Sequence, residues 1–530
     1  MPVTLPSDAL EQIVAYVDEY SDVLNVALSN KALYEAAVPL HLQYRDIRSR
    51  LNNPVLWTWL SRLDDLRAAR IRSLTLLADD EFGWEMHERT HDLSERMPSE
   101  FEKSGRERLP ELTPELTPEA CRECEVVLVK ALKRMSRLQR FRWYRVPRPV
   151  LEGPDDIWST LAQLGTVREI DVLDKEASTF DVAPIALSET FLRLSALTTF
   201  KLRTSVCSLK DDPEISQLEQ MLLQNCPDIE VLVLDLDLSE PVITPNIDRL
   251  LGDAHWSSLR VLRLGGVNCR APEVARFLIA HPRLEELALA QMMPGHAWTR
   301  LELPEDALPN LRHLECSSAQ AAALLKKASK WPLETLLGVE VHETIIDSEY
   351  FSWDDDWEEE DHKDEESGPI PSPWRTLFLE RLKAQKSITC LGVVCISAPE
   401  EMKTLAAVAP QLKHLRIKPD PDHNRIPEAE WYRLYSLFPA LEVIDDGCLI
   451  SFDPHASAEA TATYNEKVNT HIQALARGCP RLRLVQAGPD GKKVLIIRDG
   501  QSDASVRWVA RRWKGSEDQE VKDGEGEYVP

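Results

Sequence analysis

The 530-residue sequence is poor in glycine, cysteine and positive charge, and it contains no long apolar run. It has 19 glycines and 10 cysteines, and 62 lysines and arginines face 88 acidic residues, for a net charge of −26. This acidic excess disfavours binding to phosphate backbones, so we expect no nucleic-acid partner. No stretch approaches the roughly 18 apolar residues of a membrane span, and the first residues lack the features of a signal peptide. We therefore expect no membrane partner and a location in the cytoplasm, the nucleus or both.

A recurring pattern runs through most of the chain. It consists of an apolar helical stretch, often a proline, and then Leu-x-x-Leu-x-Leu, with clear copies at residues 225–236, 255–266, 280–290, 308–316 and 409–417. The first apolar positions of successive copies are Leu138, Val167, Leu197, Ile229, Leu259, Leu284, Leu311 and Leu333. They are 22 to 32 residues apart, which is close to the period of a leucine-rich repeat.

The spacing has a physical reason. The last two leucines of each copy are two residues apart, so on a short strand they face the same side. Each strand then buries its leucines against its own helix, but one repeat cannot cover its apolar face alone, so the repeats must stack. The sequence therefore predicts an α/β fold, an irregular leucine-rich-repeat solenoid with a parallel concave sheet. A doubly wound α/β domain is the alternative, and the scarcity of glycine and the absence of G-x-G-x-x-G argue against it.

Two charged segments interrupt the repeats, at residues 79–119 and 345–372. The second contains DDDWEEEDHKDEE at residues 354–366. Because like charges cannot be buried together, we interpret this acidic loop as a disordered insertion. Recruitment of a basic partner, with Trp353 and Trp357 as anchors, is the alternative. We assign the solenoid to residues 47–512 and predict a disordered tail at residues 513–530.

Residues 5–45 differ in kind from the repeats. A helix is predicted to begin near Ser7, with Leu10, Ile13 and Val17 on one side, and two more short helices follow. Three short helices in about 40 residues cannot bury their own apolar surface. The first repeats or a separate protein must therefore cover it.

This segment resembles an F-box. The matching positions are Leu5, Pro6, Asp8, Leu10, Ile13, Tyr16, Val17, Val23, Leu24, Leu28, Lys31 and Tyr34. The resemblance implies an F-box-like helical domain at residues 1–46 and a role as substrate-recognition subunit of an SCF (cullin-RING) E3 ubiquitin ligase. The implied partners are a Skp-family adaptor, a cullin scaffold and an unknown protein substrate. The residues implied to bind the adaptor are Leu5, Pro6, Leu10, Ile13, Tyr16, Val17, Leu24 and Leu28.

A second interpretation of the same helices remains open. They could cap the solenoid in a protein-interaction scaffold that has no part in a ligase. Burial of Leu10, Ile13 and Leu24 within the monomer would favour the scaffold.

The side of the predicted sheet that faces away from the helices is the candidate substrate surface. Stacking equivalent positions predicts a row of charges formed by Arg142, Asp171 and Lys201 on neighbouring strands. Self-paired surface charges are one interpretation of this row. We predict that the substrate is contacted by side chains that have fewer partners on the neighbouring strands. These are Arg140, Tyr144, Arg263, Glu286, His313, His414 and Arg416.

Three other motifs point only weakly to chemistry or nucleic acid. His87 to His91 spell H-E-x-x-H, whose histidines could bind Zn²⁺ beside a glutamate base, but the surroundings are charged. Cys121 and Cys124 form a lone C-x-x-C, and the basic aromatic run at residues 134–148 overlaps a repeat strand. We therefore predict no enzyme activity, no catalytic residue, no metal and no cofactor.

Overall fold

The computed structural model divides into two compact units, and each is described by itself. Unit 1 comprises Met1–Cys269 and unit 2 comprises Arg270–Pro530. The structure describes residues 6–17, 20–62, 67–77, 96–98, 117–144, 149–173, 187–204, 215–236, 244–289, 301–341, 373–394, 396–417, 426–446, 469–487, 492–498, 506–513 and 520–528. No helix within these ranges is both long enough and apolar enough to cross a membrane.

Unit 1 begins with a bundle of short helices. These are α1 (Ser7–Tyr16), α2 (Tyr20–Ser29), α3 (Lys31–Ala37) and a π-helical turn at Val38–Leu42. Asn30 caps α3, because its side-chain oxygen accepts a 2.9 Å hydrogen bond from the backbone N–H of Leu33. The helices enclose a small core of their own, formed by the buried residues Val14, Val23, Ala27, Ala37 and Leu42.

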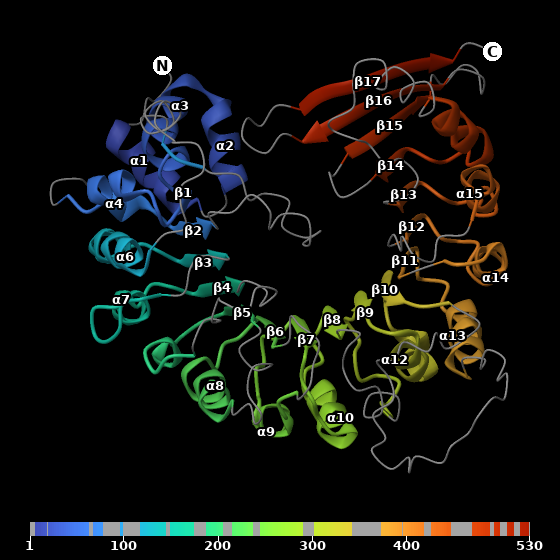
Figure 1. Cartoon of the computed structure of the whole chain (residues 1–530), viewed down its shortest axis with the longest axis horizontal. Coiled ribbons are helices and arrows are strands. Elements are labelled where there is room, and N and C mark those ends of the chain that lie inside the picture. Colours follow the sequence, from blue (N-terminus) through green and yellow to red (C-terminus); the bar gives the residue numbers. More distant parts are fainter. Residues whose placement is uncertain are drawn as a thin grey trace. The chain divides into compact units, whose positions relative to one another are not determined.

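A parallel sheet follows the bundle. Its strands are β1 (Asp46–Arg50), β2 (Ser73–Leu77), β3 (Arg140–Tyr144), β4 (Glu169–Leu173), β5 (Thr199–Arg203), β6 (Val231–Asp235) and β7 (Val261–Gly265). Each strand pairs in parallel with the strand before it in the sequence. The intervening helices lie on one side of this sheet (Figure 1), and they are α4 (Pro54–Leu60), α6 (Pro118–Leu132), α7 (Ile157–Leu164), α8 (Ser216–Gln220) and α9 (Asp248–Asp253).

Unit 2 continues the same alternation. Its parallel strands, paired in order, are β8 (Glu286–Leu289), β9 (His313–Glu315), β10 (Thr335–Val339), β11 (Cys390–Val393), β12 (His414–Ile417), β13 (Val443–Asp446) and β14 (Leu484–Ala487). Its helices are α10 (Ala271–Ala280), α12 (Ser318–Leu324), α13 (Pro373–Ala384), α14 (Pro399–Val408), α15 (Glu428–Tyr435) and the helical residues 469–478.

The last three strands depart from the predicted parallel order. β15 (Lys492–Arg498), β16 (Val506–Trp513) and β17 (Glu520–Tyr528) add to β14 in antiparallel pairs. Residues 513–530, predicted to be a disordered tail, include β17, which pairs along β16. The antiparallel addition satisfies backbone groups that the edge of β14 would otherwise leave unpaired.

The predicted insertions lie largely outside the described residues. Residues 345–372, with the acidic loop, are not described, and from residues 79–119 the structure describes 96–98 and 117–119. Arg96 and Arg48 form an antiparallel bridge on β1, with N–H to carbonyl distances of 2.9 Å.

The apolar positions of the repeats lie in the core, as their spacing predicts. The first position of each copy is buried at Leu138, Val167, Leu197, Ile229, Leu259, Leu284, Leu311 and Leu333. On the strands, alternate residues such as Phe141 and Trp143 of β3 are fully buried, and the register continues their rows to Leu232 and Leu234 of β6. Each repeat thus covers the apolar surface of its neighbours.

One carbonyl just before each strand joins successive repeats. The carbonyl of Arg72 accepts hydrogen bonds from the N–H groups of Gln139 (2.8 Å) and Arg140 (2.9 Å), both in the following repeat. Other backbone carbonyls accept two N–H groups of the following repeat in the same way. They belong to Gln139, Arg168, Thr198 and Glu230 in unit 1, and to Glu285, Arg312, Glu334, Thr389, Lys413 and Glu442 in unit 2.

A buried carboxylate on α6 fixes the chain that follows β3. Glu125 is fully buried. Its carboxylate accepts 2.8 Å hydrogen bonds from the backbone N–H groups of Val150 and Leu151. Burial raises the pKa of Glu125, and these two N–H groups act in the opposite direction. The carboxylate therefore positions the loop that leads to α7.

We predict that Glu125→Ala lowers the free energy of unfolding by about 2 kcal/mol, because two N–H groups lose their acceptor. Glu125→Gln keeps one acceptor oxygen and is expected to lose less. Urea denaturation followed by circular dichroism measures the effect, with Glu123→Ala, at an exposed position of the same helix, as the control. Equal midpoints for the two alanine variants would contradict the assigned role.

Candidate functional site

Large apolar side chains of the N-terminal bundle are exposed. They are Ile13 (48% exposed) and Tyr16 (85%) on α1, Leu24 (40%) and Leu28 (70%) on α2, and Tyr34 (51%) on α3, and together they are named the apolar stripes. Ile13 and Tyr16 are three residues apart and Leu24 and Leu28 four, so each pair lies along one side of its helix. The bundle thus exposes two such pairs and Tyr34, in addition to the apolar residues that form its own core.

The predicted adaptor residues fall into three groups. Leu5 lies outside the described residues, and Pro6 is exposed just before α1. Leu10 and Val17 are half-buried, Val17 against the bundle core. Ile13, Tyr16, Leu24 and Leu28 belong to the apolar stripes. A self-contained scaffold would bury Leu10, Ile13 and Leu24, and the exposure of Ile13 and Leu24 does not meet that condition.

Polar contacts attach the bundle to the repeats of unit 1. The carboxylate of Glu11 on α1 forms an ion pair with Arg70, just before β2. The guanidinium of Arg72 donates a hydrogen bond to the backbone carbonyl of Ala15. These contacts leave the apolar stripes exposed.

His41 lies buried at this junction, 4% exposed. Its Nε2 is 3.5 Å from Nη1 of Arg70. Burial, followed by the positive charges of Arg70 and Arg45, lowers the pKa of His41 from 6.5 to about 4, and Glu11 acts in the opposite direction. His41 is therefore neutral near pH 7.

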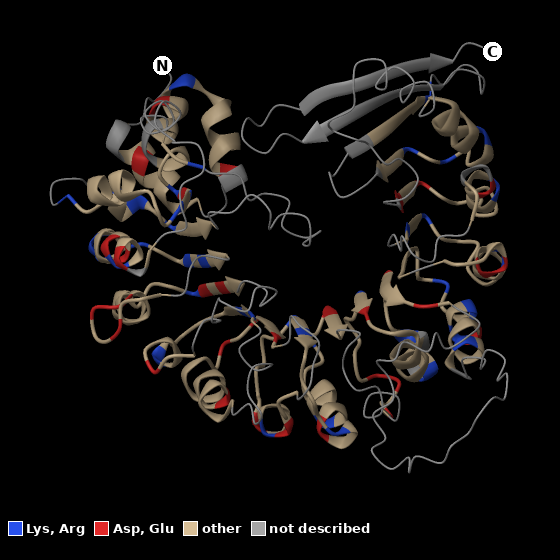
Figure 2. Cartoon of the chain, in the orientation of Figure 1, with Lys and Arg blue, Asp and Glu red and all other residues tan. Residues whose placement is uncertain are grey.

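The side of the unit 1 sheet that faces away from the helices carries charges of both signs. Arg140 and Arg142 alternate with buried residues on β3. The register places Arg142, Asp171 and Lys201 in one row across β3, β4 and β5, as the repeat spacing predicts. Figure 2 shows basic residues on β3 beside acidic residues on β4.

Asp171 is the centre of a network on this side. It is 7% exposed, and its carboxylate lies 3.9 Å from Nζ of Lys201 and 3.5 Å from the guanidinium of Arg203. It also accepts a 2.9 Å hydrogen bond from the hydroxyl of Tyr144. Arg203 was not among the predicted substrate residues. It stands two residues after Lys201, so the alternation of β5 is the signal that places it on this side.

Two predicted substrate residues of unit 1 already interact with side chains on the neighbouring strand. Tyr144 is 8% exposed, and burial with the nearby charge of Asp171 raises its pKa. Nε of Arg140 is 2.9 Å from the carboxylate of Glu169. The prediction that Arg140 and Tyr144 are less paired is therefore wrong, because both side chains reach the neighbouring strand. Arg263 is half-buried on β7.

The other four predicted substrate residues belong to unit 2. Glu286, His313 and His414 fall in one register row. His313 is exposed, the other two are half-buried, and burial lowers the pKa of His414. Nε of Arg416 lies 3.5 Å from the carboxylate of Asp445 on the next strand, so the prediction that Arg416 is less paired is also wrong.

Of the motifs weighed for chemistry, the described residues include the C-x-x-C pair and part of the basic aromatic run. His87 and His91 lie outside the described residues. Cys121 and Cys124 are buried on α6. Within the described ranges no three His, Cys, Asp or Glu side chains are placed to hold a metal ion.

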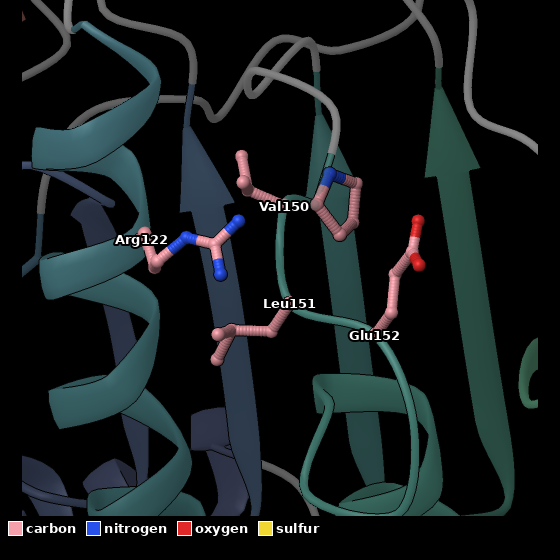
Figure 3. Close-up of a pocket in the computed structure, with 5 residues that line it drawn as sticks. Arg122, Val150, Leu151 and Glu152 are labelled. Carbon is pink, nitrogen blue, oxygen red and sulfur yellow. The ribbon is translucent and has the colours of Figure 1, made fainter.

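A hollow of about 470 Å³ lies between α6 and the loop after β3. It is lined by Arg122, Pro149, Val150, Leu151 and Glu152 (Figure 3). Arg122 and Glu152 are its charged residues, and both are exposed.

Comparisons with known proteins do not show a family for this chain. No family model and no curated protein matches the sequence. Among solved structures, a chain from the crystal structure of the Rad7 and Elc1 complex in yeast matches with a TM-score of 0.30 and 12% identity. The match covers 85% of this chain and 92% of that chain. A likeness of this degree carries no argument about function.

We predict that unit 1 loses stability as the pH falls from 6.5 to 4. The unfolded state binds a proton at His41 throughout this range and the folded state does not, so stability is present above pH 6.5 and decreases by up to roughly 3 kcal/mol. Urea midpoints at several pH values measure the effect. His41→Asn should flatten the profile, whereas His255→Asn, at an exposed position, should not. Identical profiles for the two variants would contradict the prediction.

Proposed function

We propose that this chain is the substrate-recognition subunit of an SCF-type cullin-RING ubiquitin ligase. The N-terminal bundle acts as an F-box that binds a Skp-family adaptor, and leucine-rich repeats hold a protein substrate. The observation that carries the proposal is the exposure of the apolar stripes at positions that match the F-box pattern. The chain performs no covalent step, and its contribution is a high effective concentration of substrate lysine near the ubiquitin-loaded partner.

The apolar stripes have the properties of an adaptor surface. Tyr16 and Leu28 are 85% and 70% exposed, so a partner can bury most of both side chains. Complete burial of a leucine or isoleucine contributes roughly 1.5–3 kcal/mol. The core residues Val14, Val23 and Ala27 lie beneath and hold the helices in place before binding. Pre-organisation of this kind lowers the cost of association.

The outward side of each sheet is the proposed substrate surface. Strands in fixed register present rows of polar side chains, such as Arg142, Asp171 and Lys201, on a rigid frame. This frame is set by backbone hydrogen bonds, so the polar side chains can differ without changing the fold.

We predict that the full chain binds a purified Skp-family adaptor saturably and that Ile13→Asp combined with Leu28→Asp weakens binding about 100-fold. Both substitutions place a charge where the partner buries apolar surface. Isothermal titration calorimetry measures the affinities. The matched control is Ile279→Asp with Leu437→Asp, because these residues are 47% and 42% exposed in unit 2.

Circular dichroism melting curves of each variant check that the fold is retained. Failure of the unmodified chain to bind would reject the ligase role and leave an interaction scaffold. Equal weakening by the control pair would show that the apolar stripes are not the adaptor surface.

A further inference from the structure

Positive charge is concentrated on the outward side of the unit 1 sheet, although the whole chain has a net charge of −26. The basic residues of β3, β5 and β7 on this side are named the basic face, and they are Arg140, Arg142, Lys201, Arg203 and Arg263. All five are half-buried. Because successive side chains of a strand point to opposite sides of the sheet, these five residues lie on the side opposite the core.

The intervening strands β4 and β6 carry three carboxylates on the same side. They are Glu169 and Asp171 on β4 and Asp235 on β6. Asp171 is 7% exposed, and it forms ion pairs with both Lys201 and Arg203. One buried carboxylate is thus shared by two basic groups. Among the described residues of β3 to β7, five basic side chains thus lie on this side with three carboxylates.

The geometry sets the length of a ligand. Neighbouring parallel strands are about 4.8 Å apart, so the distance from β3 to β7 is about 19 Å. An extended peptide covers this distance with about six residues. The row formed by Thr199, Val231 and Val261 is half-buried and lies beside the basic residues in register, where it can receive an apolar side chain.

The charge pattern favours a peptide over a nucleic acid. Glu169 and Asp235 interrupt the basic face, so a ligand with a charge on every unit, such as a phosphate backbone, meets repulsion at these two points. A peptide can place neutral residues there and acidic residues opposite the basic side chains. The guanidinium group of an arginine binds a single carboxylate through two parallel hydrogen bonds.

We propose that the basic face binds an acidic segment of about six residues, rich in Asp and Glu and carrying one apolar side chain that packs on Val231 and Val261. The role of this segment as the recognition element of a substrate rests on the proposed function. The binding itself does not depend on the adaptor.

The test uses the full chain and a fluorescein-labelled 12-residue peptide in which Asp and Glu alternate with Ser around a central Leu. The same peptide with Asn and Gln in place of the acids is the neutral comparison. Fluorescence anisotropy should show saturable binding of the acidic peptide, weakening when salt rises from about 50 to about 200 mM, and no binding of the neutral one.

Two matched variants locate the site. Arg142→Gln with Arg263→Gln should weaken peptide binding at least about tenfold. Lys130→Gln with Arg134→Gln removes the same charge from exposed positions at the end of α6 and just beyond it, and should leave binding unchanged. Melting curves confirm that both variants fold.

Absence of acidic-peptide binding, or equal loss in both variants, would overturn the proposal. Tighter binding of a 12-nucleotide single-stranded DNA that depends on Arg142 and Arg263 would also overturn it, since the basic face would then be a nucleic-acid site. Adaptor titration of the Arg142→Gln, Arg263→Gln variant separates the two proposals. Peptide binding without adaptor binding by the unmodified chain would reject the ligase role and support the basic face.

Discussion

Within each unit, successive parallel strands are joined by a backbone carbonyl just before the strand, which accepts two N–H groups from the next repeat. The contact runs from Arg72 to Gln139 and Arg140, and it recurs through both units. Because this carbonyl fixes the register, it also decides which side chains share a row. The row of Arg142, Asp171 and Lys201 follows from it. Register is a backbone property, so outward side chains can change while the frame stays the same.

Buried acidic side chains on the helices stabilise segments outside the strands, where the backbone carbonyls described above make no contact. Glu125 accepts from the N–H groups of Val150 and Leu151, Glu219 accepts from Leu250, and Glu401 accepts from residues 397 and 398. These carboxylates are almost fully buried, so their hydrogen bonds are protected from water. Glu125 and Glu401 hold loop residues, and Glu219 holds the first turn of α9.

The core was predictable from the sequence because burial follows spacing. Leu138, Val167 and Leu197 are buried for the reason that their period indicated. The partners of Arg140 and Tyr144 were not predictable, because they depend on how far a side chain reaches across to the next strand. The strand β17 also escaped prediction. Its pairing comes from backbone groups at the edge of β16, and its charged composition gives no sign of a strand.

Both proposed surfaces of unit 1 depend on the junction between bundle and repeats. The Glu11–Arg70 ion pair and the hydrogen bond from Arg72 to Ala15 join α1 to the residues before β2, and His41 is buried beside Arg70. A flexible link would let a bound segment sample many positions and would dilute the effective concentration of substrate. A buried, hydrogen-bonded junction restricts that sampling. The distance between the apolar stripes and the basic face is therefore set by the fold, and under the proposed function it would determine which lysines of a substrate the partner enzyme reaches.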